Sequence, residues 1–186
     1  MEKIIQLDKD LLIFLNGLGS ERYDVMWLFI TKQLHWTPIF LLVFYLLFKK
    51  VGWKNLLIIL VSIALLLTVT DQFTNLVKYT FQRLRPCNDP QINTIIRIVK
   101  DSETFSFFSG HAANSMATTV FIYQILKRHY KYAFLLFLFP LIFAYSRIYL
   151  GLHFPGDILT GYTVGVIFGF SFHKLYQIVQ KKYFSN

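Results

Sequence analysis

Five long apolar stretches constrain the fold of this chain more than any other feature. They cover residues 26–48, 56–77, 112–126, 132–150 and 157–178. A helix needs about 20 residues to cross a bilayer, and the third stretch reaches 19 residues when it is taken from Ser109 to Lys127. Lipid offers the backbone no hydrogen-bond partners, and the stretches lack the period-2 alternation of a membrane barrel. The sequence therefore predicts an all-α fold, a polytopic membrane bundle of five transmembrane helices in a single domain over residues 1–186.

The segment before these stretches has a different character. Residues 4–15 are mostly apolar, but Asp8, Lys9 and Asp10 interrupt them. Such a segment is too short and too charged to span, so it predicts an amphipathic helix at the membrane interface within residues 1–20. A cleaved signal peptide fits less well, because the acidic residues break the apolar region and no small-residue cleavage site follows.

Composition supports a membrane protein and limits the other classes. The chain is 55% hydrophobic and 18% aromatic, which is more apolar surface than a soluble domain of this length readily buries. The formal net charge is +9, but the basic residues lie between apolar stretches rather than on one contiguous face, so nucleic acid is not an expected partner. The single cysteine, Cys87, excludes an intramolecular disulfide and a multi-cysteine metal site.

The basic residues are distributed unevenly between the two ends of the predicted helices. Segments 49–55, 127–131 and 173–186 fall on one side and carry nine Lys and Arg residues with no Asp or Glu. The positive-inside rule makes that side cytoplasmic. The N-terminus and segments 78–111 and 147–157 then face the periplasm or exterior of a cell's inner (plasma) membrane.

Three polar segments on this outer side carry groups suited to phosphate chemistry. They run from Lys78 to Pro86, from Phe108 to His111, and from Ser146 to Asp157. A phosphoryl group in transfer spreads charge over three oxygens, which fixed positive charges such as Lys78, Arg85 and Arg147 stabilise. Ser109 and Gly110, at the start of a predicted helix, add a hydroxyl and backbone N–H groups that an anion can approach closely. These five residues are therefore predicted to bind phosphate.

Two histidines and an aspartate complete the predicted site. A neutral His153 nitrogen can attack phosphorus, while the Asp157 carboxylate holds the other ring nitrogen and stabilises the developing positive charge. Pro155 suits the first turn of a helix and Asp157 its N-terminus. His111 is left as the general acid for the leaving oxygen and later the base for water. The sequence contains no cluster of carboxylates to hold Mg²⁺, so we expect neither a metal nor a cofactor.

These segments resemble the signature of the type 2 phosphatidic acid phosphatase superfamily, which also includes soluble vanadium haloperoxidases and acid phosphatases. That signature reads Lys-x6-Arg-Pro, Pro-Ser-Gly-His and Ser-Arg-x5-His-x3-Asp. Ten positions match in order and register: Lys78, Arg85, Pro86, Ser109, Gly110, His111, Ser146, Arg147, His153 and Asp157. Phe108 stands where the family has proline, a departure expected to change loop shape more than activity. The matching region covers residues 78–157.

The resemblance implies a metal-independent hydrolase that acts on a lipid phosphate or diphosphate through a phosphohistidine intermediate. Undecaprenyl diphosphate ranks first as substrate, because the site is predicted to face the outer side, with phosphatidylglycerophosphate and lipid A as alternatives. Lipid-to-lipid phosphotransfer would use the same residues. An anion transporter is a further alternative, against which the clustering of charge at one face and the lack of paired half-repeats both argue. The apolar stretches exclude a soluble haloperoxidase.

Three features outside the signature carry weaker predictions. Arg83 is expected to be solvated or to face lipid head groups. Asp71 lies two turns before Lys78 on roughly the same helix face, where it either supports that lysine or packs as a polar group. A smooth face in the last stretch predicts close helix packing within the bundle or, alternatively, a homodimer contact. That face is formed by Gly161, Gly165 and Gly169.

Overall fold

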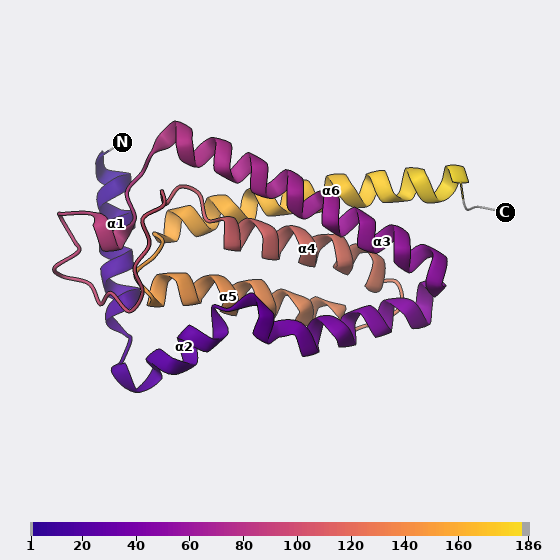
Figure 1. Ribbon diagram of the computed structural model, residues 1–186, viewed down its shortest axis with the longest axis horizontal. Coiled ribbons are helices and arrows are strands. Elements are labelled where there is room, and N and C mark those ends of the chain that lie inside the picture. Colours follow the sequence, from indigo (N-terminus) through magenta and orange to yellow (C-terminus); the bar gives the residue numbers. More distant parts are fainter. Residues whose placement is uncertain (1, 184–186) are drawn as a thin grey trace.

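A computed structural model describes residues 2–183, and over this range it is helical with no strand. The α-helices are α1 (Glu2–Gly17), α2 (Asp24–Ile30), α3 (Thr37–Phe81), α4 (Gly110–Leu126), α5 (Leu138–Tyr149) and α6 (Pro155–Tyr183). Figure 1 shows α3 to α6 running along an elongated bundle, with α1 lying across one end. The all-α prediction is confirmed, although residues 1 and 184–186 of the predicted domain lie outside the described range.

Helix α3 bends sharply at Gly52, which has φ 75° and ψ 173°. Glycine adopts such a backbone conformation without the clash that a Cβ atom would cause. The two arms form the V visible in Figure 1, so the loop predicted at 49–55 is reduced to a kink. The first arm begins at Thr37 rather than at residue 26, because 24–30 form the separate helix α2 and a 3₁₀ turn spans Gln33–Trp36.

Helices α4 and α6 form the closest contact in the bundle, and three glycines of α6 make it possible. A Cβ atom added to Gly161, Gly165 or Gly169 would lie 2.6 Å from a backbone oxygen of α4 or of its N-cap residue. Small residues at every fourth position let two helices approach this closely. Because α4 of the same chain fills this face, the glycines pack within the bundle, which is the first of the two predicted alternatives.

The outer surface of the bundle is apolar. Two stretches are long and apolar enough to cross a membrane, Gln33–Asn88 with mean hydropathy 2.2 and Pro155–Lys182 with 1.2, and Ala133–Tyr149 is a shorter apolar helix. Large apolar side chains lie exposed along them, among them Leu41, Val61, Leu76, Leu159 and Ile178. Soluble proteins seldom expose so much contiguous apolar surface, so this surface fits contact with lipid.

Candidate active site

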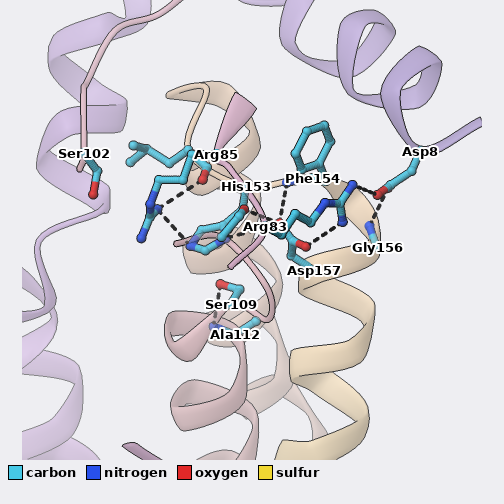
Figure 2. Close-up of polar contacts among 12 residues, drawn as sticks. Asp8, Arg83, Arg85, Ser102, Ser109, Ala112, His153, Phe154, Gly156 and Asp157 are labelled. Carbon is cyan, nitrogen blue, oxygen red and sulfur yellow. Dashed lines mark hydrogen bonds and ion pairs between the residues drawn. The ribbon is translucent and has the colours of Figure 1, made fainter. Parts of the chain in front are cut away.

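The buried guanidinium of Arg85 is fixed by four hydrogen bonds next to His153. Its Nε donates to the Thr104 carbonyl at 2.8 Å, and one terminal nitrogen donates to the Thr104 hydroxyl at 2.7 Å. The other terminal nitrogen donates to the Leu152 carbonyl at 3.1 Å and lies 3.2 Å from Nε2 of His153. An arginine can only donate hydrogen bonds, so Nε2 accepts, and its lone pair points toward a positive charge (Figure 2).

The second ring nitrogen of His153 faces Asp157. Nδ1 lies 3.5 Å from Oδ2 of Asp157 and 3.3 Å from the hydroxyl of Ser106, which itself donates to the same carboxylate oxygen at 2.5 Å. With Nε2 accepting from Arg85, the neutral ring carries its proton on Nδ1. The side chains of His153 and Asp157 are 1% and 0% exposed. Sequence analysis missed Ser106, which has no position in the signature.

The start of α6 places Asp157 in this arrangement. Pro155 is the first helical residue, where its missing N–H leaves no intrahelical bond unmade. Asp157, two residues later, turns back so that Oδ2 accepts the backbone N–H of Phe154 at 3.0 Å, as an acidic residue does in a capping box. The predicted positions of Pro155 and Asp157 in the first turn are therefore confirmed.

Arg83 forms an ion-pair bridge, so the prediction of a solvated or head-group-facing side chain is wrong. One terminal nitrogen lies 2.8 Å from Oδ1 of Asp157, and the other lies 2.7 Å from Oδ2 of Asp8 on α1. Its guanidinium also lies 3.8 Å from the ring centroid of Phe154. Sequence analysis missed this role because Asp8 and Asp157 lie more than 70 residues away on either side, and no local pattern connects them to Arg83.

The start of α4 brings a second group of signature residues to the site. Ser109 is the N-cap residue, and its hydroxyl lies 3.4 Å from the backbone nitrogen of Ala112. Its own backbone N–H donates to the carbonyl of Asp157 at 3.1 Å, which joins α4 to α6. Gly110 and His111 follow as the first residues of the helix. The helix extends over Gly110–Leu126, as the sequence predicted from the interval Ser109–Lys127.

Helix α5 contributes Ser146 and Arg147 from its last turn. Ser146 donates to the backbone carbonyl of Phe143 at 2.5 Å, a structural bond. Arg147 is buried and donates to the hydroxyl of Thr31 at 2.6 Å, whereas its Nε has no hydrogen-bond partner among residues 2–183. A buried donor without a partner is rare in native structures, so this nitrogen suits an anionic ligand. The ring of Phe143 also packs on His111, with centroids 5.3 Å apart.

The predicted phosphate-binding residues converge with the two histidines. Lys78, in the last turn of α3, lies within electrostatic range of Arg85, Arg147 and Asp157. His111 lies within range of Lys78, Arg85, Arg147 and His153. Asp71 is also within electrostatic range of Lys78 and accepts a hydrogen bond from Asn114 of α4 at 2.6 Å, which fits both of its predicted roles, support of that lysine and polar packing.

The environment of His153 keeps its imidazole neutral. Burial is the largest effect and, together with the charges of Arg85 and Arg147, lowers the pKa of this side chain from 6.5 to about 3, against the opposing pull of Asp157. A neutral ring retains the lone pair on Nε2 that a nucleophile requires. Over the described part of the chain, no group of three or more His, Cys, Asp and Glu side chains is arranged to hold a metal ion. The cationic groups here suit an oxyanion.

Comparison with known proteins identifies the class to which this fold and site belong. The family model of the PAP2 superfamily matches residues 55–181, and the chain therefore belongs to that superfamily, as the signature predicted. It is a phosphatase of this family, with the helical fold of its membrane members.

The chain is similar to several lipid phosphatases. The chain is 33% identical over 177 residues to a lipid A 4'-phosphatase of Bacteroides thetaiotaomicron, a match that covers 93% of this chain and 78% of the relative. It is 27% identical to the lipid A 4'-phosphatase of Porphyromonas gingivalis over 98% of this chain and 78% of the relative. The crystal structure of a phosphatidylglycerolphosphate phosphatase from Bacillus subtilis has the same fold, with a TM-score of 0.74 at 19% identity, covering 100% of this chain and 90% of that chain.

Proposed function

We propose that this chain removes a phosphate group from a membrane lipid through a phosphohistidine intermediate on His153. The observation that carries the proposal is the geometry of that side chain. It is buried and neutral, Arg85 faces its Nε2 at 3.2 Å, and Asp157 and Ser106 hold its Nδ1. This arrangement prepares one ring nitrogen to attack and the other to bear the charge that develops.

In the first chemical step, the substrate phosphate lies among the cationic side chains and the N–H groups at the start of α4. Nε2 of His153 attacks phosphorus and the bond from phosphorus to the lipid oxygen breaks. His111, which takes up a proton when the anionic phosphate enters the site, gives that oxygen the proton. The positive charge on the phosphorylated ring is stabilised by Asp157. Arg85, Lys78 and the unpaired Nε of Arg147 stabilise the charge on the equatorial oxygens.

The second step returns the enzyme to its starting state. His111, now neutral, takes a proton from water, and the resulting hydroxide oxygen attacks the phosphorus of the phosphohistidine. The bond between phosphorus and Nε2 breaks, inorganic phosphate leaves, and His153 is again neutral. Every charge that develops is met by a residue of the chain, so the mechanism we propose needs no metal ion.

The substrate that we propose is the 4'-phosphate of lipid A or of a similar lipid-linked sugar. Two lipid A 4'-phosphatases match almost the whole of this chain. The undecaprenyl-diphosphatase BcrC of Bacillus subtilis matches 47% of this chain at 29% identity, and the phosphatidylglycerophosphatase B of the same organism matches 66% at 30% identity. The comparisons therefore favour lipid A over undecaprenyl diphosphate, which the sequence alone ranked first.

We further propose that the site faces the periplasm or exterior from a bundle of five spans in the inner membrane. The two arms of α3, together with α4, α5 and α6, supply these spans. The kink at Gly52 and the C-terminal end of α6 lie at the end of the bundle opposite α1 (Figure 1), and that end carries the basic segments 49–55 and 127–131. Helix α1 exposes Ile4, Leu7 and Phe14, as a helix in the membrane interface would.

The test is phosphate release by the purified protein from lipid A, phosphatidylglycerophosphate and undecaprenyl diphosphate, with and without EDTA. We expect the fastest release from lipid A and no loss of activity with EDTA. Loss of activity that Mg²⁺ restores would contradict the metal-independent mechanism. Phosphate transfer only when a lipid acceptor is added would indicate a phosphotransferase, and anion flux into liposomes that survives His153→Ala would indicate a transporter.

A further inference from the structure

Helix α1 contacts both ends of the loop that carries His153. At the end of α5, the buried amide of Asn16 donates to the carbonyls of Ile148 and Tyr149 at 3.1 and 3.0 Å. Those carbonyls belong to the last turn of a helix, which lacks intrahelical donors. The same side chain accepts the backbone N–H of Arg97 at 2.7 Å. Asn16 therefore fixes the point at which the chain leaves α5 and enters the loop.

Asp8, two turns earlier in α1, holds the other end of the loop. Its Oδ1 accepts the backbone N–H of Gly156 at 2.7 Å, in the first turn of α6. Gly156 leaves room for this contact, because a Cβ atom there would lie 2.9 Å from the Asp8 carboxylate. Asp8 thus caps α6 from another helix, and α1 connects the end of α5 to the start of α6 across residues 150–154.

The second oxygen of Asp8 continues this connection to the aspartate beside His153. Oδ2 holds one terminal nitrogen of Arg83, and the other terminal nitrogen of Arg83 holds Oδ1 of Asp157 (Figure 2). With Oδ1 occupied, Oδ2 of Asp157 is left to face Ser106 and Nδ1 of His153. The charge of Asp8 balances that of Arg83, so Arg83 stays between the two carboxylates, with its guanidinium over the ring of Phe154.

We propose that Asp8 and Arg83 are positioning residues for catalysis, which act by setting the orientation of the Asp157 carboxylate and, through it, the His153 ring. The proposal rests on the role proposed above for His153. Helix α1 is in this sense part of the active site, although it lies outside the signature region. A misplacement of about 1 Å at a reacting group can reduce a rate by about 10²-fold, so the effect of this bridge is measurable in turnover.

The chain offers a matched control on the neighbouring residue of α1. Lys9 forms an ion pair with Asp89 at 2.7 Å and a hydrogen bond with Gln91 at 2.7 Å. This pair joins the same helix to the same outer loop and is similarly enclosed, with side chains 11% and 15% exposed. Within residues 2–183 this pair makes no hydrogen bond or ion pair with Asp8, Arg83 or Asp157, although Asp89 is within electrostatic range of Arg83. Asp89→Asn therefore tests the attachment of α1 while every direct contact of the bridge stays in place.

The experiment measures kcat and KM for the full-length protein in detergent, on an aryl phosphate and on a lipid phosphate. We expect Asp8→Asn and Arg83→Gln each to lower kcat by about 10-fold or more while KM changes less than about twofold, because neither residue contacts the phosphate-binding groups. The double variant should lose no more than the worse single variant, since the two residues act as a unit. Arg83→Lys, which keeps the charge but not the fork, should retain an intermediate kcat.

Asp89→Asn should lower kcat less than about twofold, since it leaves the bridge intact. If Asp8→Asn lost no more activity than Asp89→Asn, or if the losses of Asp8→Asn and Arg83→Gln simply multiplied, the proposal would be overturned. Asp8→Asn keeps an acceptor for Gly156 and is the variant expected to fold in every case; its melting midpoint verifies this. An inactive wild-type protein would refute the proposed function instead, so the two failures are distinguishable.

Discussion

The interface between α4 and α6 and the loop end of the bundle are held together in different ways. The interface is built from small residues, and its glycines approach backbone oxygens of the facing helix. The loop end is held by charges and amides, chiefly Asp8, Arg83 and Asn16. The interface sets the distance between the helix that carries His111 and the helix that carries Asp157, whereas the polar contacts set how side chains are oriented within that distance. The two regions should therefore respond differently to substitution.

The largest expected effect is at the loop end, on chemistry. His153→Ala should abolish phosphoenzyme formation and lower kcat by more than about 10⁴-fold, because it removes the nucleophile. The intermediate is measured by incubating the protein with a radiolabelled substrate and counting the acid-labile label that stays bound to the protein. Phosphate release measures turnover. A trapped phosphoenzyme that persisted in His153→Ala would overturn the assignment of this residue.

The next largest effect is expected for His111 and depends on the leaving group. An alkoxide from a lipid monophosphate needs a proton more than an activated aryl oxide does, and general acid–base help is typically worth about 10²–10⁴-fold. His111→Ala should therefore retain relatively more activity on the aryl phosphate than on the lipid, whereas His153→Ala loses both. The measurement is kcat/KM on each substrate. Equal fractional losses would indicate that His111 binds phosphate rather than transferring a proton.

A smaller effect is expected at the interface, on stability. Gly165→Ala should lower stability by about 1–3 kcal/mol, because its Cβ atom would lie 2.6 Å from the carbonyl oxygen of Ala113. Gly17→Ala is the control, since nothing lies within 4 Å of a Cβ atom at that position. Melting midpoints in detergent provide the measurement. Equal midpoints for the two variants would mean that α4 and α6 can move apart without a loss of stability, so that their packing is less close than described.

The same contrast explains how much the sequence could predict. Helix content, the start of α4 beside Ser109, the entry of α6 at Pro155 and the glycine face all follow from patterns within a few residues. The signature residues follow from fixed spacings. The role of Arg83 does not, because its two partners lie 74 and 75 residues away. Ser106 was missed for a similar reason, since its partner Asp157 is 51 residues away.

The sequence also located the first predicted helix imperfectly. The continuous apolar stretch from residue 26 predicted one span, but a hydropathy pattern does not reveal where the backbone turns. The chain turns at Gln33–Trp36, and α3 starts with Pro38 in its first turn, a position that proline favours because it needs no intrahelical donor. Trp36 then donates to the carbonyl of Ile30 at 2.8 Å, which closes the turn.

An effect comparable in size to that of Gly165→Ala is expected in the pH dependence of stability, and it belongs to the loop end alone. The pKa of His153 is about 3 in the folded protein and about 6.5 in an unfolded chain. As the pH falls below about 6.5, the unfolded state therefore takes up a proton and the folded state does not. This residue lowers the free energy of unfolding below about pH 6.5 and has almost no such effect above pH 7. Between pH 7 and pH 5 the difference amounts to about 2 kcal/mol.

The measurement compares melting midpoints of the wild type and His153→Gln across this pH range. Glutamine does not titrate, so the wild type should lose more stability than the variant as the pH falls from 7 to 5. Above pH 7 the difference between the two melting midpoints should not change with pH. Gly165→Ala provides the contrast, because a steric clash between helices has no proton linkage and should lower the midpoint by the same amount at every pH. If the wild type and His153→Gln changed in parallel between pH 7 and pH 5, His153 would take up a proton as readily in the folded protein as in the unfolded chain. The buried site would then not keep the ring neutral, and below about pH 6.5 the Nε2 lone pair that a nucleophile requires would be protonated.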